Sequence, residues 1–100
     1  MLLSSKIRDI GVWDMKKILF DNNKNVICDA LKQLRVKRKL SQQQLAAKMQ
    51  TLGVSIDQQM ISKIESNTRQ VTVYELACFC LVLQTTPNDL LAEFFEKYTV

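Results

Sequence analysis

The sequence predicts an all-α fold, and three of its features indicate this class. The chain has 100 residues, 47% of them hydrophobic, which suits one small domain with a core and is too apolar for a disordered chain. Two glycines and one proline leave few turns, which disfavours a sandwich or barrel of many strands. Apolar residues also recur at helical spacing after helix start signals. We therefore expect helices joined by short loops.

The chain divides into an N-terminal arm, residues 1–24, and a folded domain, residues 25–100. Apolar residues are scattered among charged ones through the arm and Gly11 interrupts any helix, so we expect only one or two short helices there. Trp13 and Phe20 of the arm either cover the core or build a dimer contact. The sequence leaves both alternatives open.

Two helices are expected in the first half of the domain. The first should run from about Val26 to Lys39, where apolar residues recur at helical spacing. The second should begin after Ser41, because Ser41 and Gln44 have the spacing of a capping box. It should end before Gly53, since a left-handed C-terminal cap favours glycine. Its expected buried residues are Leu45, Ala46, Met49 and Leu52.

A short third helix is expected from about Gln58 to Ser66. Asp57 is a good N-cap, because its carboxylate accepts backbone N–H bonds and faces the positive end of the helix dipole. Ile61 and Ile64 fill only a narrow buried stripe, so a wide polar side is left facing outward. The outward residues are Gln58, Gln59, Ser62, Lys63 and Ser66.

Two further helices complete the expected domain. Thr72 and Glu75 form a second capping box, and the helix that follows is almost continuously apolar. We expect it to lie at the centre of the core through Val73, Leu76, Ala77, Cys80, Leu81 and Leu83. The last helix opens at Thr86 and Pro87, an N-cap followed by a proline at the first helical position.

Charge is distributed unevenly along the chain. Residues 24–48 carry seven cations against Asp29 alone, a net +6, whereas residues 73–100 carry one cation against four acids, a net −3. This asymmetry indicates one face that meets polyanions, although a solvated helix surface explains it equally well. The cations of the run Lys37-Arg38-Lys39 stabilise the negative C-terminal end of the first helix, and some of them are also available to neutralise DNA phosphates.

Several functional classes are disfavoured by composition. The chain has three cysteines and no histidine, and Cys78 and Cys80 point to different sides of a helix, so we expect buried free thiols, no metal site and no cofactor. No nucleophile with a plausible base and no phosphate-binding glycine loop is present, so we expect no enzyme. The apolar run "LACFCLVL" is too short to span a membrane, and "MLLSSKIRD" is too short for a signal peptide. A cytoplasmic location is expected.

A short helix that follows another across a tight link, both with polar outer sides, is the arrangement of a helix-turn-helix. In that motif the second helix enters the major groove of DNA. A glutamine amide both donates and accepts, so Gln58 and Gln59 suit adenine, while Lys63 suits guanine or phosphate. Adjacent glutamines alone are common on any surface helix.

The segments "LKQLRVKRKLSQQQLAAKM", "DQQMISKIES" and "VTVYELACFCLVLQTTPNDLL" together resemble the Cro/C1-type (XRE family) helix-turn-helix domain of phage repressors and related bacterial regulators. The resemblance covers Val26 to about Glu93. It rests on separated residues that follow one another in the order typical of the family: Arg35, Ser41, Gln42, Leu45, Ala46, Ile61 and Glu65. It implies a five-helix lambda-repressor-like domain, here with an N-terminal extension.

The resemblance also implies roles for individual residues. The implied contacts to DNA bases come from Gln58, Gln59, Ser62 and Lys63, and those to phosphates from Gln42, Gln43, Arg69 and Arg38. Arg35 and Glu65 are implied to form a structural ion pair. Ala46 and Ile61 are fifteen residues apart, which exceeds the spacing of compact members, and we interpret this as a longer second helix. Met60 faces either a thymine methyl or the core, and we favour the core.

We therefore expect a sequence-specific, double-stranded DNA-binding transcriptional regulator. We expect it to act as a homodimeric repressor, because two-fold pairing doubles the contacts of a small domain. The alternative function is a protein-interaction module such as an antitoxin, which binds its partner through the arm or the acidic C-terminal end. The sequence does not identify the operator, the target genes or an inducer.

Overall fold

The structure, a computed structural model, describes residues 23–98, so the arm with Trp13 and Phe20 falls outside the described residues. Within this range the elements are helices without strands, as expected for an all-α fold. They are α2 (Cys28–Lys37), α3 (Gln42–Thr51), α4 (Gln58–Glu65), α5 (Val73–Leu83) and α6 (Pro87–Tyr98).

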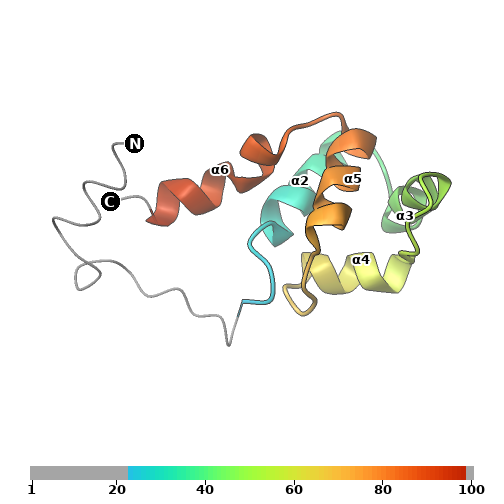
Figure 1. Cartoon of the computed structure of the whole chain (residues 1–100), viewed down its shortest axis with the longest axis horizontal. Coiled ribbons are helices and arrows are strands. Elements are labelled where there is room, and N and C mark those ends of the chain that lie inside the picture. Colours follow the sequence, from blue (N-terminus) through green and yellow to red (C-terminus); the bar gives the residue numbers. More distant parts are fainter. Residues whose placement is uncertain (1–22, 99–100) are drawn as a thin grey trace, which may run out of the picture.

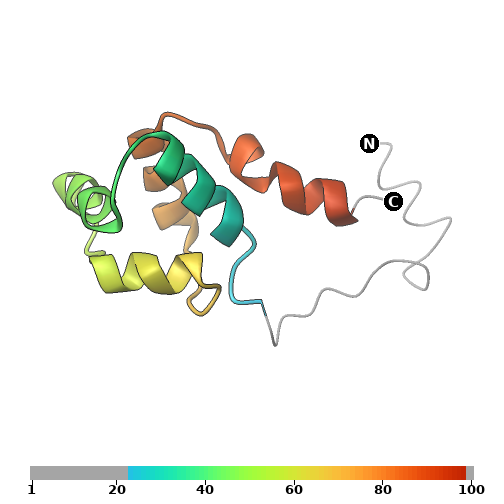
Figure 2. The same cartoon turned by 180° about the vertical axis from the view of Figure 1, so that it is seen from behind.

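Helices α2 to α5 form the body of the domain, and α6 extends from it (Figure 1). Helix α4 contacts both α2 and α3 and lies at the N-terminal end of α5. The reverse view shows α2 in front of α5, with α4 again along the same edge of the body (Figure 2). Helix α6 packs on α2 and α5, where Leu90 is buried. This arrangement leaves one long side of α4 facing outward.

The core is made by apolar residues from all five helices. Leu31 of α2, Leu45 of α3, Ile61 of α4 and Phe79 of α5 are all fully buried. Burying each such side chain contributes about 1.5–3 kcal/mol. The expectation that Leu52 is buried is wrong, because it lies beyond the last turn of α3 and is 42% exposed.

Helix α5 differs most from expectation. Val73, Ala77 and Leu81 were expected in the core, but all three are exposed. Phe79 occupies the centre instead, fully buried. A helix that is apolar on nearly every side does not indicate which side faces inward, so the packing of its neighbours decides the orientation.

The helix caps agree with the sequence prediction. Ser41 Oγ accepts from the Gln44 backbone N–H at 3.0 Å, and the Gln44 side chain accepts from the Ser41 N–H at 2.8 Å. Asp57 Oδ1 accepts from the Met60 N–H at 2.8 Å. Gly53 has a φ of +86°, the left-handed conformation for which a glycine was expected after α3. These caps fix where α3 and α4 begin and how the chain passes between them.

Two asparagines join the segment before α2 to the end of α4. Asn25 Nδ2 donates to the carbonyls of Ile64 and Arg69, at 2.9 and 3.0 Å. Asn67 Oδ1 accepts from the backbone N–H groups of Lys24 and Asn25, at 2.8 and 3.1 Å. Asn67 is in the left-handed conformation, with a φ of +63°. The segment before α2 is therefore fixed beside the C-terminal end of α4.

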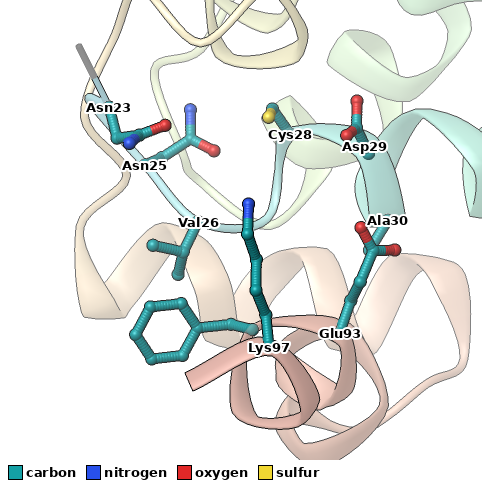
Figure 3. A pocket seen from close by; sticks show the side chains of 9 residues that line it. Asn23, Asn25, Val26, Cys28, Asp29, Ala30, Glu93 and Lys97 are labelled. Carbon is teal, nitrogen blue, oxygen red and sulfur yellow. The ribbon is translucent and has the colours of Figure 1, made fainter. Parts of the chain in front are cut away.

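Helix α6, the first turn of α2 and the segment before it line a cavity of about 120 Å³ (Figure 3). Cys28 lines this cavity and is partly exposed, whereas Cys78 and Cys80 are buried, and all three are free thiols. Burial raises the pKa of the Cys28 thiol, so it stays protonated at neutral pH. Over residues 23–98, no helix is both long and apolar enough to cross a membrane.

Candidate nucleic-acid interface

Helix α4 separates buried isoleucines from an exposed polar side. Ile61 and Ile64 are fully buried, which holds the helix against α2 and α3. Met60 is partly buried and packs against the core, the alternative that the sequence favoured. The residues expected on the outer side are all exposed: Gln58, Gln59, Ser62, Lys63 and Ser66. We call Gln58, Gln59, Ser62 and Lys63 the α4 face.

The first turn of α3 is tied to both ends of α4 by one side chain. Gln42 accepts a hydrogen bond from Gln58 Nε2 at 3.2 Å and donates from its own Nε2 to Glu65 Oε1 at 3.0 Å. Gln43, at the next position of α3, is exposed. Both glutamines lie at a helix N-terminus, where backbone N–H groups attract anions. The structure therefore brings Gln42 directly to the α4 face.

An ion pair joins α2 to the last turn of α4. Arg35 Nε donates to Glu65 Oε2 at 2.6 Å, and Arg35 Nη2 donates to Glu65 Oε1 at 3.0 Å. The arginine also donates from Nη1 to the Leu40 carbonyl at 2.7 Å, in the link between α2 and α3. The side chains of Arg35 and Glu65 are only 11% and 3% exposed. A bidentate pair of this kind defines both the distance and the rotation of α4 relative to α2.

Arg69 makes a second ion pair that the sequence did not reveal. Its Nη1 and Nη2 donate to Glu75 Oε1 and Oε2, each at 3.0 Å, and Nη1 also donates to the Gln70 carbonyl. Burial alone would raise the pKa of the Glu75 carboxyl, but hydrogen bonds from Arg69 and Thr72 outweigh it and lower that pKa. Three of the five guanidinium N–H groups are engaged in this way.

Arg38 is placed away from the α4 face. Its Nε donates to the Leu83 carbonyl at 2.8 Å and its Nη2 to the Gln84 carbonyl at 3.3 Å. These carbonyls lie at the C-terminal end of α5, the end opposite to the one near α4 (Figure 1). A cation at a helix C-terminus stabilises the negative end of the dipole. The structure thus assigns Arg38 a capping contact that the sequence analysis missed.

Lys24 adds a cation that sequence reasoning did not select. Its backbone N–H bonds to Asn67 Oδ1, so it lies just beyond the C-terminal end of α4, and its side chain is exposed. The two residues are separated by 43 positions, and no local motif connects them. Only the asparagine contacts of the folded chain reveal this proximity.

The assembled surface presents amide, hydroxyl and ammonium groups on an outward-facing helix. Such groups suit hydrogen bonds to base edges and phosphate oxygens. Among the residues that the structure describes, no group of three or more metal-ligating side chains is present.

Comparison with known proteins identifies a family. The family model HTH_3, described as helix-turn-helix, matches residues 31–90, which is more than half of the chain. Comparisons with curated proteins and with solved structures returned no match. The matched range includes α3, the link at Gly53 and α4, the elements that carry the surface described above. The chain belongs to the Cro/C1-type helix-turn-helix family, a family of DNA-binding regulators.

Proposed function

We propose that the protein binds double-stranded DNA sequence-specifically, as a homodimeric repressor that reads the major groove with α4. The observation that carries this proposal is the α4 face: polar residues all exposed on a helix whose opposite side is fully buried. An α-helix with its side chains is about 10–12 Å across, so α4 fits within the major groove, which is about 12 Å wide.

Base reading is assigned to the start of α4. Gln58 and Gln59 are its first two residues, and each amide pairs in a bidentate manner with adenine N6 and N7. Ser62 and Lys63 follow on the next turn and reach neighbouring bases. The hydrogen bond from Gln58 to Gln42 holds the Gln58 amide before DNA arrives, which lowers the entropy cost of binding.

Phosphate contacts are assigned around this reading surface. Gln42 and Gln43 lie at the N-terminus of α3, where the helix dipole favours a phosphate oxygen. Arg69 donates through its two remaining N–H groups. Arg38 makes a phosphate contact of secondary importance, because its guanidinium is held at the C-terminal end of α5, away from the α4 face.

The test compares specific and random DNA. Bound duplexes are selected from a random pool with the full chain, and the preferred site is then used with single variants. Gln58→Ala and Gln59→Ala should each weaken that site by about 1–3 kcal/mol yet leave binding to random duplex nearly unchanged. Gln33→Ala is the matched control, since this glutamine is exposed on α2. Equal losses on specific and random duplex would exclude base reading by α4.

A protein-interaction module, such as an antitoxin, is the second candidate function. The observation that favours it is the exposure of large apolar residues on α5, including Val73 and Leu81. Co-purification with a partner encoded next to this chain would support it. Specific DNA affinity of the chain without a partner would support the repressor.

A further inference from the structure

The second half of helix α6 borders a cavity. Leu90, near the start of α6, is buried against the body, whereas Glu93, Phe94 and Lys97 line the cavity of about 120 Å³. Helix α6 has 12 residues and extends from the body (Figure 1). Isolated helices of this length are marginal in water. A segment that fills the cavity therefore stabilises α6.

The lining of this cavity combines apolar and acidic groups. Phe94 lines it from α6, and Val26, which is 40% exposed, points from the segment before α2 toward α6 (Figure 3). Two carboxylates, those of Asp29 and Glu93, line it against one ammonium, that of Lys97, which gives a net −1. Cavities of about 150 Å³ bind benzene, so the size suits one aromatic ring. The chemistry suits an apolar side chain accompanied by positive charge.

The N-terminal arm reaches the domain at the rim of this cavity. Asn23, the first described residue, lines the cavity, and residues 1–22 precede it. Three residues span at most about 11 Å, so Phe20 lies within that distance of Asn23. A tether this short holds Phe20 at an effective concentration of about millimolar. An occupant from outside the chain must compete with it.

Residues 16–20, which we call the KKILF segment, have the composition that suits the cavity. Three of them are apolar, and the other two are Lys16 and Lys17. Helix α6 carries three acids against one lysine, a net −2. Opposite charges at a partly exposed contact attract modestly, and they favour this segment over an acidic one. The acidic C-terminal end thus has a complement within the same chain.

We propose that the arm docks on its own domain, with Phe20 in the cavity and the lysines of the KKILF segment beside the carboxylates that line it. Docking buries Phe20 and covers Val26. It also bears on α4, because Asn25 lines the same cavity and donates to the Ile64 carbonyl at the end of α4, at 2.9 Å. A partner protein that binds the arm must first displace it from the cavity.

Cys28 reports on the cavity without an added label. It lines the cavity and is partly exposed, whereas the other two thiols are buried. The rate at which iodoacetamide alkylates Cys28 in the full-length chain is followed by mass spectrometry. Phe20→Ala should raise this rate at least about tenfold, because the docked segment shields the thiol and reaction then follows the undocked fraction. An unchanged rate would overturn the cavity as the docking site.

Leu3→Ala is the matched control for Phe20→Ala. It also shortens an apolar side chain of the arm, but it lies 20 positions before Asn23. Its alkylation rate should equal that of the wild type. An increase as large as that of Phe20→Ala would overturn the assignment of the KKILF segment as the part that docks.

Disulfide cross-linking tests the direction of the arm. A disulfide requires Cα atoms within about 7 Å. In a Cys28→Ser background, which removes the partly exposed native thiol, Phe20→Cys is combined with Lys97→Cys in one full-length chain and with Thr68→Cys in another. Lys97 lines the cavity, whereas Thr68 is exposed at the end of α4. The second pair therefore probes a path toward the α4 face.

Docking predicts an intrachain disulfide for the pair with Lys97→Cys, at a yield well above that for the pair with Thr68→Cys. An equal or higher yield with Thr68→Cys would overturn the proposal and place the arm beside α4. A covalent dimer in place of the intrachain product would also overturn it, because the occupant would then come from a second copy.

Salt dependence tests the contribution of the two lysines. Lys16→Gln/Lys17→Gln should raise the alkylation rate of Cys28 about two- to fivefold at low salt, a smaller effect than that of Phe20→Ala. The wild type and this variant should react at equal rates in about 1 M salt, where the charges are screened. Equal rates at low salt as well would overturn the pairing of these lysines with the carboxylates of the cavity.

Discussion

The two arginine–carboxylate pairs of residues 23–98 share a bidentate geometry but differ in their surroundings. Arg35 and Glu65 lie 30 residues apart in the sequence, and their side chains are 11% and 3% exposed. Arg69 and Glu75 lie six residues apart, with side chains 27% and 10% exposed. The first pair connects two helices through the interior, and the second connects a loop to the first turn of α5.

The Arg35–Glu65 pair therefore holds helices together, whereas the Arg69–Glu75 pair shapes one loop. Glu65 receives donors from α2 and, through Gln42, from α3, so the position of the α4 face depends on it. The Glu75 carboxylate accepts hydrogen bonds from Arg69 and from the backbone N–H of its capping partner Thr72, which are both near it in sequence. Removing the first pair should therefore disturb the whole domain, and removing the second only its edge.

The largest effect is expected from Arg35→Met. This change leaves the Glu65 carboxylate buried without its cation, and breaking a buried pair in this way costs about 3–5 kcal/mol. The free energy of unfolding, measured by urea denaturation, should fall by that amount.

The double variant Arg35→Met/Glu65→Met is the control for this result. It removes both charges and fills the space with apolar atoms, so it should recover part of the lost stability. A double variant less stable than Arg35→Met would show that the carboxylate stabilises the fold without its arginine. A loss below about 1 kcal/mol for Arg35→Met would place the pair among surface ion pairs.

Arg69→Met should have a smaller effect, about 1–2 kcal/mol. Glu75 keeps the Thr72 N–H as a donor, and the Arg69 side chain is 27% exposed, so this pair is less costly to break. The same urea denaturation measures the loss. A loss as large as that of Arg35→Met would remove the distinction between the two pairs.

The pH dependence of the free energy of unfolding reports on the Arg69–Glu75 pair more directly than the stability loss at one pH does. The folded-state pKa of Glu75 is lowered from its ordinary value of 4.5. A carboxyl with a lowered pKa stabilises the fold above its unfolded pKa, and this contribution is lost as the pH falls through the folded pKa. Arg69→Met should therefore lose less stability than the wild type when the pH is lowered from 6 towards 3, in steps of about one unit. Parallel curves for the two proteins would contradict this assignment.

Local signals in the sequence predicted the helix starts correctly. Ser41, Asp57 and Thr72 each cap the expected helix, because a cap needs only side chains and N–H groups within three or four residues. Gly53 was predictable for the same reason, since its left-handed conformation is a property of one residue. The exposed side of α4 followed from the spacing of its isoleucines.

Contacts between distant residues could not be predicted in this way. The apolar sequence of α5 has no polar side to orient it, so Val73 was expected inside and Phe79 was not selected. Arg69 and Arg38 were assigned to DNA from their place in the family pattern. Within the domain Arg69 also pairs with Glu75, six positions later, and Arg38 donates to the carbonyls at the end of α5, a contact that depends on how the chain returns on itself.

The smallest predicted effect is that of Gln42→Ala. Glu65 loses one neutral donor but keeps both bonds from Arg35, so stability should fall by only about 0.5–1.5 kcal/mol in urea denaturation. Gln43→Ala is the matched control and, at an exposed position, should change stability by less than about 0.5 kcal/mol. Equal stabilities of the two variants would show that the Gln42 amide adds nothing to the interior network. A loss well above that range would mean instead that Gln42 is as important as Arg35 in holding α4 in place.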